Sequence, residues 1–137
     1  TRKGGNHNFG PNTEEFGEAE FKRLVSVYES LKLNGYNPDL YVDGYITGYL
    51  LVRKNDYRYV ISEGQHRIAA LAALGYDKII CRFDLKPWTN EVVFYNQAPK
   101  WPQVEAGIFS SKLAKLCFEH FFKDNNTKLC AFLNSKN

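Results

Sequence analysis

The chain has 137 residues, of which 44% are apolar and 24% are charged, so it holds enough apolar sequence for one core. Its 15% of aromatic residues excludes wholesale disorder. The net charge of +3 is too small for a protein that binds polyanions over a whole face, so only a local basic cluster could contact nucleic acid.

The cysteines and the absence of long apolar runs bear on the compartment. Cys81, Cys117 and Cys130 form no CxxC pair, and their odd number suggests neither a zinc ribbon nor a disulfide framework. No apolar run reaches the roughly 18 to 20 residues of a membrane helix. We therefore expect reduced thiols and a cytoplasmic protein without a membrane segment. Because the chain contains no Met and begins at Thr1, we also expect a processed or truncated piece that has lost flanking domains.

Hydrophobic periodicity predicts a single domain with an N-terminal arm at residues 1–10, a core at 11–84 and a helical C-terminal extension at 85–137. The first predicted helix spans 13–33, with Asn12 as its cap and Glu15 in the capping-box position. Its apolar stripe consists of Phe21, Leu24, Val25, Tyr28 and Leu31. The Asn34-Gly35 pair supplies the left-handed stop.

The middle of the chain predicts a hairpin and a crossover. Residues 45–53 and 57–62 are rich in β-branched and aromatic residues, and a Lys-Asn-Asp turn separates them. Residues 65–74 form an Ala-rich helix, and 79–83 form the next strand. Strand, helix and strand make a compact βαβ-like crossover. The fold class is therefore α+β, with a small mixed sheet and helices.

The C-terminal third is expected to be mainly helical. Residues 92–95 form a short strand or a helical turn, and a helix capped by Ser110 or Ser111 reaches about Lys123. Its helically spaced residues are Leu113, Leu116, Cys117, His120 and Phe121, with Phe118 and Phe122 flanking them. A short helix around 128–133 follows. No second metal-type ligand is spaced to join His120, so no metal site is predicted.

The junction between the second strand and its helix carries the main functional signal. Glu63 and Gly64 break the strand, and the following helix leaves backbone N–H groups free at its N-terminus. His66 and Arg67 lie in this first turn, where cations are unfavourable unless an anion joins them. We expect Gly64, Gln65, His66 and Arg67 to bind a phosphate. The alternative is that Arg67 pairs with Glu63 or another surface acid.

The run Tyr-Val-Ile-Ser-Glu-Gly-Gln-His-Arg-Ile-Ala-Ala-Leu-Ala-Ala-Leu-Gly-Tyr, followed by Ile-Ile-Cys-Arg-Phe, resembles the ParB/sulfiredoxin-like fold over about residues 36–84. The resemblance implies that a nucleotide phosphate, from ATP or CTP, binds at Gly64 to Arg67. Sulfiredoxin activity is not expected, because Gln65 replaces the Cys of the motif Gly-Cys-His-Arg. A complete partitioning protein is not expected either, because its Gly-Glu-Arg-Arg is matched only at Gly64 and Arg67. In kinase-like members an acid precedes the Gly, and Glu63 could hold Mg²⁺ here.

Two classes of function follow. The first is a nucleotide-binding domain, whose activity, if it is an enzyme, is phosphoryl transfer or nucleotide hydrolysis with Glu63 or His66 as acid or base. The second is a nonenzymatic DNA-binding or protein-interaction module, in which the same motif and a basic hairpin meet phosphates or acids on a partner. That hairpin contains Arg53, Lys54 and Arg58. Lys3 and His7 of the arm could close over the phosphate as a lid.

Overall fold

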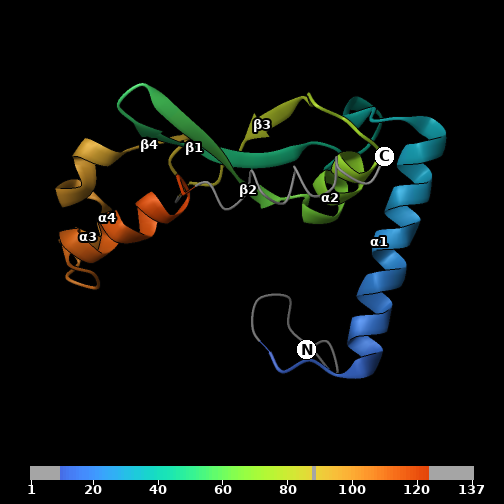
Figure 1. Ribbon diagram of the computed structural model, residues 1–137, viewed down its shortest axis with the longest axis horizontal. Coiled ribbons are helices and arrows are strands. Elements are labelled where there is room, and N and C mark those ends of the chain that lie inside the picture. Colours follow the sequence, from blue (N-terminus) through green and yellow to red (C-terminus); the bar gives the residue numbers. More distant parts are fainter. Residues whose placement is uncertain (1–9, 88, 124–137) are drawn as a thin grey trace. The chain divides into compact units, whose positions relative to one another are not determined.

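The computed structural model describes residues 10–87 and 89–123 (Figure 1). The contacts divide the chain into two compact units. Unit 1 runs through Thr47 and resumes at Ile61–Arg82, whereas unit 2 contains Gly48–Val60 and the chain from Phe83 onward. The boundary between the two units therefore crosses both strands of the hairpin, at Thr47–Gly48 and Val60–Ile61, and also lies at Arg82–Phe83, close to the predicted end of the core at residue 84. The predicted C-terminal extension forms one unit with the turn end of the hairpin.

Four strands and several helices confirm the α+β class with a small mixed sheet. Strands β1 (Ile46–Arg53) and β2 (Asp56–Glu63) form the predicted hairpin around Lys54 and Asn55, and Lys54 takes the left-handed φ of 54° that this turn requires. The strand order is β2-β1-β3, with β3 at Cys81–Phe83. The predicted crossover from β2 to β3 therefore passes over β1. Strand β4 (Val92–Phe94) runs parallel to β1, so the predicted helical extension also supplies a strand.

Unit 1 is built on two helices that pack against each other, α1 (Glu14–Asn34) and α2 (Gln65–Ala73). The cap of α1 is Thr13, whose hydroxyl accepts from Phe16 N at 3.3 Å, so the prediction of Asn12 was wrong by one residue. Gly35 ends the helix at φ 70°, as predicted. A short 3₁₀ turn, η1 (Pro38–Leu40), then leads into β1.

The predicted apolar stripe of α1 is only partly covered. Phe21 remains 66% exposed, and no residue of α1 is fully buried. The buried apolar residues of unit 1 are Ile46 of β1 and Ala70 and Leu71 of α2. The small side chains of α2 let this short helix pack closely against α1.

Unit 2 has an aromatic core. After β4 come η2 (Tyr95–Lys100), α3 (Pro102–Glu105) and α4 (Ser111–His120), and Ser110 caps α4 by accepting from Leu113 N at 3.2 Å. Phe118 and Phe122 are 4% and 7% exposed and join Leu51 in the core. The stripe predicted for this helix was the wrong face, because its members are exposed or only partly buried and the two flanking rings are inside. Two phenylalanines four residues apart bury more apolar area than the leucine stripe.

Several predictions fall outside the described residues. They concern the arm with Lys3 and His7, the helix at 128–133, and Cys130. No helix in the described ranges, 10–87 and 89–123, is long and apolar enough to cross a membrane. Neither Cys81 nor Cys117 is joined in a disulfide.

Candidate functional site

The junction between β2 and α2 is shaped by Gly64. This residue is the N-cap of α2 and has φ 98°, a left-handed conformation that favours glycine. A Cβ at this position would come within 2.9 Å of Ile46 Cγ1, so the close approach to β1 also requires glycine. No side chain caps α2, and its first hydrogen bond runs from Ile68 N to Gly64 O at 3.0 Å. The backbone N–H groups ahead of that bond are left for a ligand or solvent.

The three side chains that follow Gly64 do not converge on one point. Gln65 Nε2 donates to Ser62 O at 2.9 Å, which turns this side chain back onto β2. His66 Nε2 lies 3.5 Å from a carboxylate oxygen of Glu20 in α1. Arg67 instead donates from Nη1 to the backbone oxygen of Asp43. The sequence predicts that His66 and Arg67 hold one phosphate together. In the structure the two side chains contact different partners and do not form a preformed cluster.

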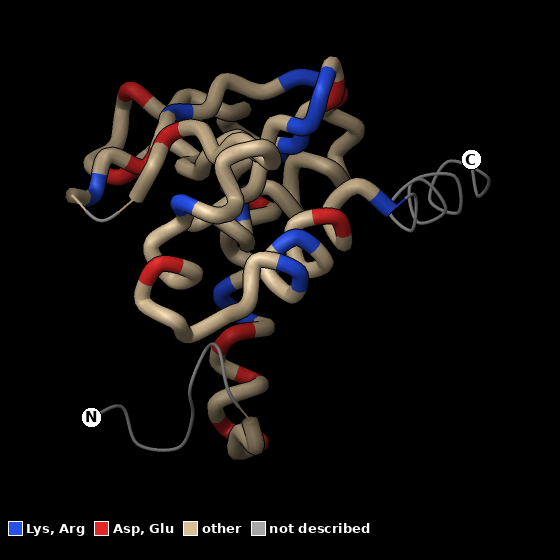
Figure 2. Tube along the Cα trace, turned by 90° about the vertical axis from the view of Figure 1, so that its left-hand side faces the viewer, with Lys and Arg blue, Asp and Glu red and all other residues tan. Residues whose placement is uncertain are grey.

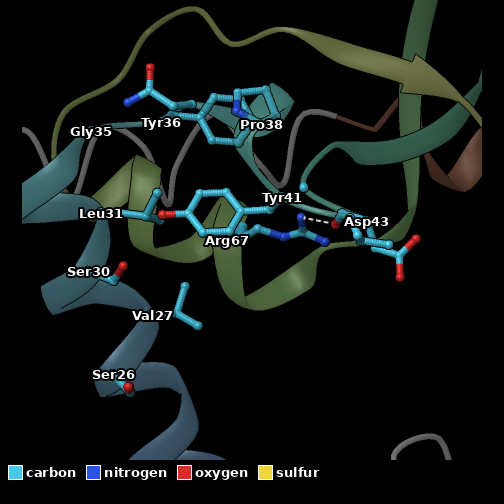
Figure 3. Close-up of a pocket in the computed structure, with 13 residues that line it drawn as sticks. Ser26, Val27, Ser30, Leu31, Gly35, Tyr36, Pro38, Tyr41, Asp43 and Arg67 are labelled. Carbon is cyan, nitrogen blue, oxygen red and sulfur yellow. Dashed lines mark hydrogen bonds between the residues drawn. The ribbon is translucent and has the colours of Figure 1, made fainter.

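Arg67 reaches into the larger pocket of unit 1, with a volume of about 410 Å³ (Figure 3). One wall is the C-terminal half of α1, and the other is the chain from Gly35 to Gly44. The pocket is mostly apolar and is lined by Ser26, Val27, Ser30, Leu31, Gly35, Tyr36, Asn37, Pro38, Tyr41, Val42, Asp43, Gly44 and Arg67. Among the described residues, Arg67 is the only basic one that lines it.

The charge of Arg67 has no carboxylate partner within the described ranges. Its hydrogen bond goes to the neutral carbonyl of Asp43, and the carboxylate of Asp43 points the other way (Figure 3). This turn is tightly fixed, because Asp43 has φ 48° and a Cβ on Gly44 would lie 2.1 Å from Pro38 O. The alternative in which Arg67 pairs with Glu63 is not what the structure contains. Within the described part of the chain, the other N–H donors of Arg67 have no protein acceptor.

Unit 1 has a second, more polar pocket of about 260 Å³, whose lining includes Asp39, Tyr45, Glu63 and Arg82. The Tyr45 hydroxyl donates to Asp39 Oδ1 at 2.6 Å, and this hydrogen bond raises the pKa of Tyr45 above its ordinary value. The guanidinium of Arg82 lies 3.6 Å from the centre of the Tyr45 ring, with Nη2 3.7 Å from the same carboxylate oxygen. Glu63 lines this pocket and Arg67 the larger one, so the predicted acid and the predicted phosphate ligand lie in adjoining pockets. The residues common to both linings are Pro38, Tyr41, Asp43 and Gly44.

No sequence pattern predicted this cluster of Asp39, Tyr45 and Arg82. Asp39 and Tyr45 are six positions apart, and it is the Asp43-Gly44 turn between them that brings them together. Arg82 arrives from β3, nearly forty positions later in the chain. The Asp-Gly pair is typical of a turn, but no local pattern indicates that this turn brings Asp39 and Tyr45 into contact.

The basic residues of the hairpin belong to unit 2 and are partly engaged. The guanidinium groups of Arg53 and Arg58 lie 4.5 and 4.9 Å from the centre of the Phe122 ring. Arg58 also pairs with Asp56 at 2.6 Å, and Lys54 occupies the turn. Figure 2 shows acidic residues interspersed with the basic ones along the chain.

Across the described ranges, no three His, Cys, Asp or Glu side chains are grouped so that they could hold a metal ion. The candidate site consists of Arg67, which has no carboxylate partner in the described ranges, the pocket that it lines, and the N-terminus of α2, which no side chain caps. In comparisons with known proteins, the chain matches no protein-family model, no curated protein and no solved structure.

Proposed function

We propose that the protein is a nucleotide-binding domain of the ParB/sulfiredoxin-like type and that Arg67 holds a phosphate of the nucleotide in the larger pocket of unit 1. The observation that carries this proposal is the guanidinium of Arg67, which lines a 410 Å³ pocket without a carboxylate to neutralise it. Guanidinium groups bind phosphate through paired hydrogen bonds, and a partly buried charge favours an anionic ligand.

The rest of the pocket suits the body of a nucleotide. The ring of Tyr41 and the side chains of Leu31 and Val27 offer an apolar wall for a base. The hydroxyls of Ser26 and Ser30 lie four residues apart on α1, one helical turn, and so face the same side. The family resemblance suggests ATP or CTP. A cytoplasmic location, expected from the odd number of cysteines in the sequence, is part of the proposal.

Catalysis is a further part of the proposal. If the nucleotide is turned over, Glu63 or His66 is the acid or base, and Mg²⁺ would be held largely by the phosphates. Glu20 positions the ring of His66, whose Nε2 lies 3.5 Å from its carboxylate oxygen. Glu63→Gln or His66→Ala should then abolish turnover while nucleotide binding persists. Unchanged turnover in both variants rules out these roles.

The test of binding is thermal unfolding with ATP, CTP and inorganic phosphate, each with and without Mg²⁺. A ligand at about 100 times its dissociation constant adds about 2.7 kcal/mol to the stability, which is easily measured. We expect this stabilisation to disappear in Arg67→Ala. The matched control is Arg82→Ala, because Arg82 belongs to the same unit but lines the other pocket. Equal stabilisation of the wild type and Arg67→Ala contradicts the proposal.

The alternative of a DNA-binding or protein-interaction module has weaker support. Arg53 and Arg58 already contact Phe122, and Arg58 is paired with Asp56. Binding of DNA through several phosphates should weaken steeply with salt. Two results would exclude this mode of DNA binding: no binding at about 50 mM salt, or an affinity that stays the same when the salt concentration is raised.

A further inference from the structure

We infer that the larger pocket of unit 1 selects a nucleotide with a single phosphate, a nucleoside monophosphate, rather than a triphosphate. This inference rests on the proposed function and specifies its ligand. The family resemblance points toward triphosphates, whereas the charges that line the pocket point to one phosphate.

The first argument is the number of charges. A phosphate monoester carries about −1.5 to −2 at neutral pH, and a triphosphate carries several charges more. Arg67 is the only Lys or Arg among the described residues that line the pocket, so it offers one positive charge. Among the described residues that line the pocket, a second and third phosphate would meet no further cation and would gain little beyond their solvation.

The second argument concerns Mg²⁺, which usually accompanies a bound triphosphate and takes one or two protein carboxylates. Asp43 is the only acidic residue lining the pocket within the described ranges, and its carboxylate points away from Arg67 (Figure 3). Glu63, the acid nearest in sequence to the motif, lines the other pocket. The site therefore supplies little for a metal-bound polyphosphate, and we expect binding that does not depend on Mg²⁺.

The third argument is the hydrogen-bonding capacity next to the apolar wall. Ser26 and Ser30 place two hydroxyls on the face of α1 that lines the pocket, and Figure 3 shows both side chains on that helix below Leu31. The Tyr41 hydroxyl is directed toward Leu31 in the same view. These groups suit the hydroxyls of a ribose and the polar edge of a base. A ligand with one anionic end and a largely uncharged body fits this arrangement.

The experiment is isothermal titration of the whole protein at constant ionic strength with inorganic phosphate, adenosine, cytidine, AMP, CMP, ATP and CTP. Each nucleotide is measured with and without Mg²⁺. We expect the better monophosphate to bind at least as tightly as its triphosphate and about tenfold or more tighter than its nucleoside, a difference of about 1.4 kcal/mol. Mg²⁺ should leave the affinity of the monophosphate unchanged.

Variants identify the pocket. Arg67→Ala should reduce the monophosphate affinity to that of the nucleoside. The double variant Ser26→Ala/Ser30→Ala should weaken the monophosphate and leave inorganic phosphate unaffected, and Glu29→Ala is the control on the same helix outside the pocket. A triphosphate that binds about tenfold tighter than its monophosphate, or a requirement for Mg²⁺, overturns the single-phosphate inference but leaves the phosphate pocket standing. Absence of all phosphate binding, or binding unchanged in Arg67→Ala, overturns the proposed function itself.

Discussion

Arg67 of unit 1 and the two hairpin arginines of unit 2, Arg53 and Arg58, are used in different ways. In unit 2, Arg53 and Arg58 lie over the ring of Phe122, which is itself part of the aromatic core. In unit 1, Arg67 lines a pocket and donates only to a backbone carbonyl. An arginine stacked on a core ring serves the stability of the fold, whereas an arginine beside an open pocket retains its charge for a ligand. The position of a basic residue in the sequence does not separate these two roles.

The largest expected effect tests the structural role of the aromatic core in unit 2. Phe122→Ala removes a ring that is 7% exposed and stacked 5.2 Å from Phe118. The free energy of unfolding should fall by about 3 to 5 kcal/mol, as for other buried phenylalanines. Denaturant unfolding followed by tryptophan fluorescence measures it, since Trp101 stacks on Phe118 in the same core. A loss below about 1 kcal/mol would show that the stack of rings is not a core.

The next effect concerns the start of the helix that carries Arg67. Gly64→Ala should lower the free energy of unfolding by about 2 to 4 kcal/mol, because it combines a left-handed backbone with a close contact to Ile46. Gly75→Ala is the matched control, with φ 84° but no atom within 4 Å of its Cβ. It should cost only the backbone strain of about 1 to 2 kcal/mol. Equal losses in the two variants contradict the close approach at Gly64.

A smaller effect is expected when the arginines of the two sites are removed and the free energy of unfolding is measured without ligand. Arg67→Ala should lower the free energy of unfolding by about 1 kcal/mol or less, because it removes one hydrogen bond to a carbonyl at the surface. The double variant Arg53→Ala/Arg58→Ala should lose about 1 to 2 kcal/mol through its contacts with Phe122 and Asp56. Urea titration of both variants measures the difference. A loss above about 2 kcal/mol for Arg67→Ala would make it a structural residue.

The smallest effect is the titration of Tyr45 in the second pocket of unit 1. The hydrogen bond to Asp39 raises the pKa of Tyr45, so the folded state holds the phenolic proton more tightly than the unfolded state. The resulting stabilisation is complete below the ordinary tyrosine pKa of 10.0 and is lost as the pH rises through the higher folded pKa. The tyrosinate absorbance is measured against pH in the wild type and in Tyr45→Phe, and the difference between the two curves gives the titration of Tyr45. In Asp39→Asn the midpoint should move down, and an unchanged midpoint would mean that Asp39 is not the cause.

Local sequence patterns were sufficient for much of the fold. The helical spacing of Leu24, Tyr28 and Leu31, the stop at Gly35 and the strand-to-helix break at Gly64 depend on neighbours within one or two turns of chain. The hairpin and α2 were predicted to within one or two residues for the same reason. The face of α4 was not, because that helix carries two apolar stripes and only the surrounding core selects between them.

The candidate site shows the same division. From the sequence alone it follows that an uncapped helix N-terminus with Gly64, His66 and Arg67 stands after a strand, because that depends only on adjacent residues. Which partner His66 and Arg67 each have depends on contacts between segments far apart in the chain. Glu20 meets His66 from α1, and the carbonyl of Asp43 meets Arg67 from a turn fixed by Pro38 and Gly44. Such long-range contacts leave no periodic signal, so the free charge of Arg67 and its pocket emerge only when the folded chain brings those segments together.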